Sequence, residues 1–331
     1  MNPIIRRRTV LAGLAGVAAA PLAGTAVAQQ GNWPERPVRV IVPWPAGGST
    51  DVLTRLVCDR LQKKLGQSFI VDNRSGAAGN IGVDAAAKSA PDGYTLGVAA
   101  VGHWSINQYL YSKLPWDIDR DFVPVSVAFE LPNVAVVPVK YNPSKTLAEF
   151  IAWAKAKKGG IAYGSPGVGT TPHLSGALLA SRAGYEATHV PFRGAAQTIP
   201  AMLSGDVDFA LDNLASYIPQ IQQGQMRALA VTSAKRFPSL PDVPTMEEAG
   251  MKDFVITSWH GYVFPVGTPK PVVEKLNGAL KEIAADRSLQ ERFLQAGGFV
   301  VWTTPEGLAE RARRERPMWQ EAVRLSGAQV D

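Results

Sequence analysis

Two glycine-rich segments of the 331-residue chain carry residue types that can hold an anion. The first, Val42–Asp51, reads Val-Pro-Trp-Pro-Ala-Gly-Gly-Ser-Thr-Asp, and the second, Tyr163–His173, reads Tyr-Gly-Ser-Pro-Gly-Val-Gly-Thr-Thr-Pro-His. Each follows a short apolar run and precedes a helical pattern, so each is expected to join a strand to a helix. Free backbone N–H groups and the positive end of a helix dipole make such a junction an anion site. The pair therefore predicts a small anion held between two parts of the protein.

The second segment favours a carboxylate over a phosphate. It has the Gly-x-x-x-x-Gly frame of a phosphate loop, but the lysine that must precede the Ser/Thr is missing, which disfavours nucleotide hydrolysis. Ser165, Thr170 and the loop amides can satisfy a carboxylate without a full positive charge. Thr171 and the proline after it predict the start of a helix. His173 lies just inside that helix, where it either reaches the ligand or packs at the surface.

In the first segment, the glycine pair allows close approach of a ligand, and Ser49 or Thr50 can cap the following helix. An ordinary strand-to-helix turn would use the same residues, so both explanations stay open. Asp51 falls in the first helical turn, where its charge stabilises the helix dipole but would oppose an anion placed too close. We interpret Asp51 as structural.

Other polar residues stand at the ends of predicted strands. His103, Arg193 and Asp212 each follow or end an apolar run, so each either lines a cleft between lobes or makes a local turn contact. The sequence contains no Gly-x-Ser-x-Gly, no His-Glu-x-x-His and a single cysteine, and its four histidines are scattered. These absences favour binding without chemistry, and we expect no cofactor and no metal.

Short apolar runs alternate with helical patterns along the chain, which predicts an α/β fold with mostly parallel sheets flanked by helices. Two stretches, 129–134 and 256–263, are interpreted as crossings between lobes. We therefore predict one lobe from residues 30–130 and 258–331 and a second from residues 131–257. Among the individual elements, we expect separate strands at 123–129 and 134–139 and a helix over 104–113.

The N-terminus is typical of an export signal. Three arginines, Arg6 to Arg8, precede an apolar stretch that ends in Ala-Val-Ala at Ala28, which predicts cleavage near that residue. The paired arginines fit the twin-arginine route, and general secretion stays open. Because residues 1–28 hold three arginines and no acid, their removal lowers the formal charge from +6 to +3. This leaves no basic block of the kind that binds nucleic acid, and we expect a monomer in the periplasm.

Taken in order, several segments make the chain resemble the Bug family, the TctC-type periplasmic receptors of tripartite tricarboxylate transporters. These segments are the two glycine-rich loops, Val71–Gly82, Ala90–Tyr94, Val190–Gly194, Gly205–Phe209 and Asp212-Asn213. The resemblance covers the chain from Trp33 to the C-terminal helix. It implies a two-lobed, type II periplasmic-binding-protein fold that closes like a Venus flytrap on a small carboxylate.

The resemblance also implies a set of ligand contacts made by loop amides, hydroxyls and waters. Carried onto this sequence, the contacts of the two loops fall on Trp44, Ala46, Gly47, Gly48, Ser49, Thr50, Ser165, Gly167, Gly169, Thr170 and Thr171. The rest of the cleft, which sets selectivity in the family, is expected to include His103, His173, Arg193 and Asp212. Trp44 stands where smaller residues or other aromatics are common, which suggests an aromatic or flat ligand.

The predicted function is therefore capture of a small carboxylate and its delivery to the membrane permease subunits of the transporter. A receptor that feeds a sensor kinase and an exported enzyme with His103 or His173 as base are the alternatives. The sequence leaves open whether the ligand is a mono-, di- or tricarboxylate, an amino acid or an aromatic acid.

Overall fold

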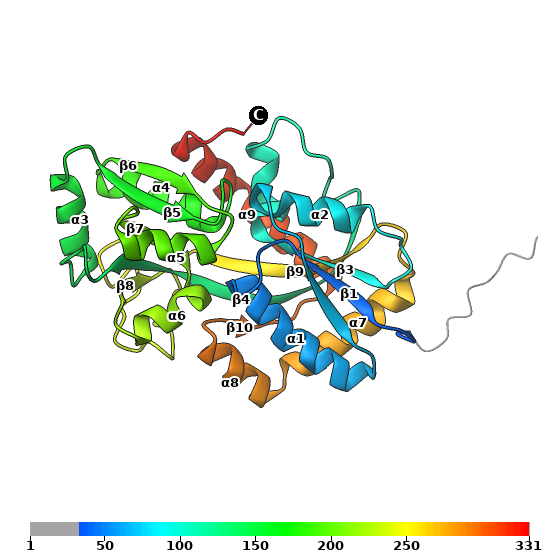
Figure 1. Ribbon diagram of the computed structural model, residues 1–331. Coiled ribbons are helices and arrows are strands. Elements are labelled where there is room, and N and C mark those ends of the chain that lie inside the picture. Colours follow the sequence, from blue (N-terminus) through cyan, green and yellow to red (C-terminus); the bar gives the residue numbers. More distant parts are fainter. Residues whose placement is uncertain (1–32, 331) are drawn as a thin grey trace, which may run out of the picture. The chain divides into compact units, whose positions relative to one another are not determined.

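The computed structural model describes residues 33–330, and the predicted export segment lies outside them. Strands and helices alternate along this part of the chain (Figure 1). The strands are β1 (Val38–Val42), β2 (Phe69–Asn73), β3 (Thr95–Ala100), β4 (Phe122–Pro138), β5 (Ile161–Ser165), β6 (Ala187–Pro191), β7 (Phe209–Asn213), β8 (Met226–Val231), β9 (Thr257–Pro265) and β10 (Phe299–Val300). The helices are α1 (Ser49–Leu65), α2 (Asn80–Ala87), α3 (Leu147–Ala156), α4 (Thr171–Ala183), α5 (Ala195–Ser204), α6 (Leu214–Gln222), α7 (Lys270–Ala284), α8 (Arg287–Gln295) and α9 (Pro305–Ser326).

The strands form a mixed sheet in the order β2-β1-β3-β9-β4-β7-β5-β6, with β8 and β10 also paired to β4. Strand β1 is parallel to β2 and β3, and β5 is parallel to β6 and β7. Every pairing of β4 and β9 is antiparallel, which differs from the mostly parallel sheets expected for each lobe. The α/β class is as predicted. The centre of the sheet is antiparallel because β4 and β9 run side by side in opposite directions, a pairing that requires no helical crossover.

Strand β4 joins two groups of strands. Its residues 122–132 pair with β9, and its residues 133–138 pair with β7 and β8. The separate strands expected at 123–129 and 134–139 are therefore wrong, because one strand of 17 residues covers both. We call β1, β2, β3, β9, β10 and residues 122–132 the first strand group, and β5 to β8 with residues 133–138 the second strand group. The change of partner falls inside the predicted crossing at 129–134.

The helix expected over 104–113 is also wrong. A π-type turn η2 (Gly102–Ile106) and a 3₁₀ turn η3 (Asn107–Tyr109) occupy this stretch. Their polar side chains bond to other parts of the fold: Ser105 Oγ donates to the Ala312 carbonyl of α9, and the Asn107 amide donates to Asn80 Oδ1. These long-range bonds outweigh the helical pattern of the local sequence.

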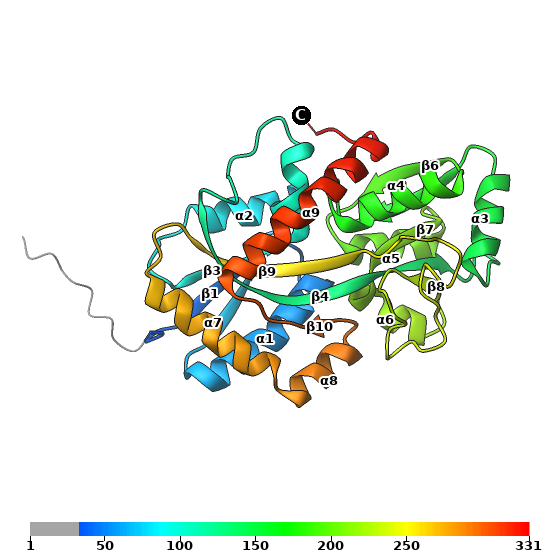
Figure 2. The same ribbon diagram turned by 180° about the vertical axis from the view of Figure 1, so that it is seen from behind.

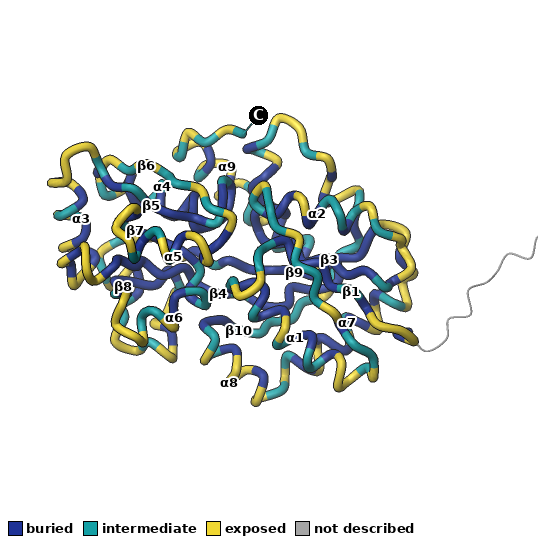
Figure 3. The backbone as a smooth tube through the Cα atoms, viewed as in Figure 1, coloured by how far each residue is buried: buried dark blue, intermediate teal, exposed yellow. Residues whose placement is uncertain are grey.

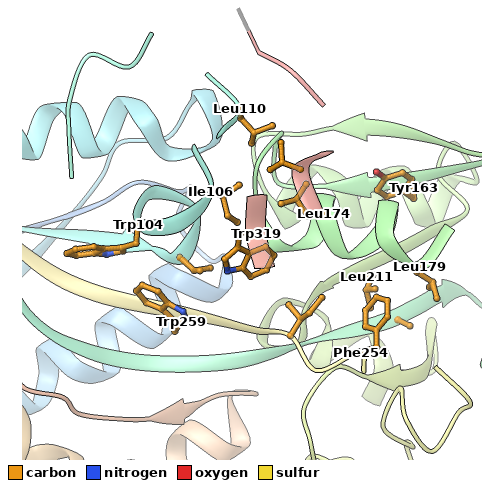
Figure 4. Packing of buried hydrophobic residues seen from close by; sticks show 14 of the residues in the cluster. Trp104, Ile106, Leu110, Tyr163, Leu174, Leu179, Leu211, Phe254, Trp259 and Trp319 are labelled. Atoms are coloured by element: carbon orange, nitrogen blue, oxygen red, sulfur yellow. The ribbon is translucent and has the colours of Figure 1, made fainter. Parts of the chain in front are cut away.

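Helix α9 packs against β4, α4 and the η2 turn (Figures 1 and 2). The central strands and the facing side of this helix are buried (Figure 3). Figure 4 shows Trp319 of α9 near Trp104 of η2 and Trp259 of β9, in the same cluster as Leu174 and Leu179 of α4. The cluster thus ties the C-terminal helix to the η2 turn and to α4. Within residues 33–330, no helix is long and apolar enough to cross a membrane.

Candidate functional site

A cavity lies between elements of the first and second strand groups. Its volume is about 50 Å³, measured as the space open to the centres of water-sized spheres. Because one water needs roughly 10–15 Å³ on this measure, the cavity has room for several waters or one small organic molecule. Its wall consists of Trp44, Pro45, Gly48, Ser49, Thr50, Ala78, Ala100, Val101, Gly102, His103, Asn107, Pro166, Gly169, Thr170, Thr171, Pro172, Gly194, Ala195, Ala196, Asp212, Asn213, Ser216, Ser258 and His260.

The start of α6 contributes Asn213 and Ser216 to this wall. Helices α1, α4 and α5 also begin at the cavity. Four amides in their first turns, those of Thr50, Thr171, Ala195 and Ala196, donate to no acceptor among the described residues. The hydroxyl of Thr171 is buried and has no partner there either. First-turn amides point along the helix axis and carry the partial positive charge of the helix dipole. The cavity therefore offers converging hydrogen-bond donors to a negatively charged group.

The first glycine loop is held in place by a buried carboxylate. Asp51 accepts hydrogen bonds from the Gly47 amide, from Arg55 Nε and from Asn73 Nδ2, each at 2.9–3.0 Å. Burial alone would raise the pKa of Asp51, but these hydrogen bonds outweigh it and lower that pKa. Asn73 also donates to the Trp44 carbonyl. Asp51 thus fixes the shape of the loop, in agreement with the structural role predicted for it.

The second glycine loop is held by two neighbouring histidines, His173 and His189. Ser165 Oγ lies 2.6 Å from His189 Nε2 and accepts from the Gly167 amide, while the Gly169 amide donates to His173 Nδ1. The two imidazole rings are 4.0 Å apart between centroids. Burial lowers the pKa of His173 to about 3 and that of His189 to about 4, so both rings are neutral at pH 7. The amides of Gly167 and Gly169 therefore already have acceptors within their own loop.

An aromatic wall closes one side of the cavity. The ring of Trp44 lies 5.4 Å from His103 and 5.7 Å from His260, between centroids. His260 Nε2 is 2.9 Å from Thr50 Oγ1, and His103 Nδ1 accepts from the Ala100 amide. Burial lowers the pKa of His103 to about 4 and that of His260 to about 3. The wall is thus aromatic and uncharged at pH 7.

Asp212, at the end of β7, is also part of the cavity wall. Its side chain accepts from the Asn213 amide at 2.6 Å and lies 3.2 Å from the Tyr217 hydroxyl. Burial raises the pKa of Asp212 to about 7. Among the described residues, the wall of this cavity contains no lysine or arginine. A negative charge placed here must be stabilised by neutral donors, namely backbone amides, hydroxyls and the unpartnered Nε2 of His103.

Comparison with known proteins identifies the family. The model of the tripartite tricarboxylate transporter family receptor, TctC, matches residues 53–316. The chain belongs to this receptor family. The BugT protein of Bordetella pertussis is 35% identical over 317 residues, which cover 96% of this chain and 95% of BugT.

Solved structures agree with this assignment. An R. palustris protein with adipate has a TM-score of 0.87 and 34% identity, over 90% of this chain and 100% of that one. The periplasmic binding protein BugD has a TM-score of 0.84 and 34% identity, over 90% and 100%. MatC from Rhodopseudomonas palustris with bound malate has a TM-score of 0.81 and 32% identity, over 88% and 100%. The receptor therefore has the two-lobed periplasmic-binding-protein fold, and its family consists of periplasmic solute-binding proteins.

The structure brings most of the predicted site residues of the receptor to the cavity and places the others around it. Those that line it are Trp44, Gly48, Ser49, Thr50, His103, Gly169, Thr170, Thr171 and Asp212. Six are not part of the wall: Ala46, Gly47, Ser165, Gly167, His173 and Arg193. Of these, Gly47, Ser165, Gly167 and His173 make the internal bonds of the two loops. Arg193 is exposed to solvent, and its amide bonds to Gln197.

Several residues of the cavity wall were not predicted from the sequence. The α5 start, Ala195 and Ala196, has no polar side chain and gave no signal other than the glycine before it. Ser216 of α6 bonds to Ser49 of α1 across the cavity, with the two Oγ atoms 2.6 Å apart. His260 lies in the predicted crossing 256–263, where a histidine inside an apolar run was the available signal. Among the described residues, no group of three or more His, Cys, Asp or Glu is arranged to hold a metal ion.

Proposed function

We propose that this receptor captures a small carboxylate in the cavity and delivers it to the permease subunits of a tripartite tricarboxylate transporter. The observation that carries the proposal is the set of free first-turn amides of α1, α4 and α5 around a cavity whose described wall contains no lysine or arginine. These donors suit a carboxylate, whose two oxygens accept several hydrogen bonds at once. The relatives solved with adipate and malate support this ligand class.

In this proposal, some residues contact the ligand and others hold the two loops in shape. The carboxylate lies against the first turns of α1, α4 and α5, with Thr50 and Thr171 adding hydroxyls. Trp44 packs against the remainder of the ligand, and its ring favours a flat or aromatic group there. Gly47, Ser165, Gly167 and His173 hold the loops in the shape that presents these donors. This receptor would bind without carrying out chemistry on its ligand.

Export and domain closure complete the proposal. Residues 1–28 act as a cleaved signal, of the twin-arginine type, that brings a monomer to the periplasm. Residues 30–130 with 258–331 form one lobe and residues 131–257 the other, and β4 and β9 connect them. Ligand binding favours the closed arrangement, because only there do α1, α4 and α5 reach the same carboxylate.

Calorimetry and thermal unfolding with malate, adipate, benzoate and aspartate test the capture step. At least one acid is expected to bind, and at 100 times its dissociation constant it should add about 2.7 kcal/mol to the free energy of unfolding. Small-angle scattering should show compaction with the same acid only. A receptor that binds none of the four and does not compact would contradict the proposal. Uptake of the bound acid by cells that hold the permease, with and without the receptor, tests delivery.

A further inference from the structure

Among the described residues, the buried acid Asp212 has no positive partner. It is 2% exposed and lies on the cavity wall at the end of β7. The hydrogen-bond donors to its oxygens there are the Asn213 amide and the Tyr217 hydroxyl, and burial keeps Tyr217 neutral by raising its pKa. The histidines of the same wall, His103 and His260, are neutral at pH 7 because they are buried. An ionised Asp212 would therefore have no charge to balance its own.

The hydrogen bond from Tyr217 to Asp212 is a long one. A hydroxyl that donates to a carboxylate usually lies at about 2.5–2.7 Å, whereas Asp212 Oδ2 and Tyr217 Oη are 3.2 Å apart. Because Oδ1 accepts the shorter bond from the Asn213 amide, Oδ2 is the oxygen assigned to carry a proton. The raised pKa of Asp212, about 7, is caused by burial without a cation.

A ligand carboxylate adds a second negative charge to the same cavity. Two carboxylates that share a site cannot both stay ionised at low cost, and one of them takes a proton. The ligand accepts hydrogen bonds from the free amides of α1, α4 and α5, which favour its charged form. Asp212 has a single backbone donor, so it is the weaker acid of the two.

We propose that Asp212 takes up one proton from solvent when a carboxylate binds and that its carboxyl group then donates a hydrogen bond to the ligand. This inference rests on the proposed function and adds a proton to its binding step. The proton moves from bulk water to Asp212 Oδ2, and no bond of the ligand changes. A ligand with an ammonium group would have the opposite effect, because it would stabilise ionised Asp212 and release a proton.

The experiment measures the dissociation constants of malate, adipate and benzoate by calorimetry at pH 6 and pH 8. Since a group with a pKa of about 7 goes from about nine-tenths to about one-tenth protonated over this range, binding should weaken about tenfold at pH 8. Titrations at pH 7 in two buffers of different ionisation enthalpy should show net proton uptake. Asp212→Asn, which keeps a hydrogen-bond donor and cannot titrate, should bind equally well at both pH values. Asp206→Asn, which changes an exposed acid between α5 and β7, should keep the tenfold change.

The outcomes separate this inference from the proposed function. Binding that is equal at pH 6 and pH 8 in the wild type, or a tenfold change that persists in Asp212→Asn, would overturn the role of Asp212 and leave carboxylate capture intact. Tighter binding at pH 8 with proton release would assign an ammonium partner to Asp212 instead. Failure of all three acids to bind at either pH would overturn both proposals.

Discussion

At the scale of single residues, the polar groups of the site fall into two classes. The amides of Gly47 and Gly169 already donate to Asp51 and His173, which follow them in the same glycine-rich segments. The hydroxyl and the amide of Thr171, in contrast, have no partner among the described residues. A free buried donor costs stability until a ligand pairs with it. Part of the free energy of ligand binding should therefore come from pairing these unsatisfied donors with the ligand.

Thr171→Val tests this division. The substitution removes a hydroxyl that has no partner in the described chain, so the thermal unfolding temperature should stay the same or rise slightly. The affinity for the bound carboxylate should fall by about five- to tenfold, because one hydrogen bond of about 1 kcal/mol is lost. Calorimetry and thermal unfolding give the two readouts. Thr54→Val, a buried threonine of α1 outside the cavity wall, serves as the control and should bind normally; equal affinity in Thr171→Val and wild type would disprove the role of the hydroxyl.

At the scale of elements, the two strand groups approach each other through glycines. A Cβ atom on Gly102 would lie 3.1 Å from the Gly169 carbonyl oxygen, and one on Gly194 would lie 3.2 Å from Pro45 Cδ. In each contact, one residue lies in a loop that follows a strand of the first strand group, and the other lies in a loop that follows a strand of the second strand group. The absence of a side chain at these two positions lets the cavity walls meet.

Gly194→Val should therefore weaken ligand binding by hindering closure. The backbone of Gly194 is extended (φ 164°), a conformation that valine adopts, and opening of the ligand-free protein would separate Gly194 from Pro45. The ligand-free protein should therefore unfold at an unchanged temperature. Calorimetry should show at least a tenfold loss of affinity, and scattering should show reduced compaction with ligand. Gly278→Ala in α7 is the control, because no atom lies within 4 Å of its added Cβ and alanine suits a helix. Full compaction of Gly194→Val would contradict the closure role.

The sequence predicted the parts of the site that have a local signature. Ser49 and Thr171 with its proline placed the starts of α1 and α4 correctly, but the predicted caps are wrong. Gly48 is the N-cap of α1 and makes no side-chain bond, whereas the hydroxyl of Thr170 caps α4. The contributions of Ala195 and His260 could not be recognised from the sequence, since they depend on where α5 and β9 lie in the fold. The η2 turn was mistaken for a helix because its shape depends on contacts with α9, more than 200 residues away.

At the scale of the whole molecule, buried histidines set the response to acid. Burial lowers the pKa of His103, His173 and His260 from an unfolded value of about 6.5 to about 3–4. For these bases the unfolded chain binds more protons in acid, so stability is complete above pH 6.5 and falls as the pH drops toward 4. Asp212 acts in the opposite direction, because its pKa is raised and its contribution falls as the pH rises from about 4 to 7.

Four histidines outweigh one acid, because burial lowers the pKa of His189 to about 4 as well, so the free energy of unfolding should be lower at pH 5 than at pH 7.5. The net loss is on the order of 5 kcal/mol, from 1.36 kcal/mol per pKa unit for each group. Urea unfolding followed by tryptophan fluorescence measures it. Asp212→Asn removes the opposing term, so its loss between the same pH values should be larger. An unfolding free energy that is equal at the two pH values would mean that the histidines are not buried as described.

The free amides at the starts of α1, α4 and α5 also bear on how this family diversifies. A backbone N–H is present in every residue except proline, so most substitutions in the wall leave the grip on the carboxylate in place. Mutation at positions such as Trp44 can then change which acid fits while the anchor persists through every intermediate sequence. Single substitutions in such a cavity can therefore change the preferred ligand without passing through a receptor that binds nothing.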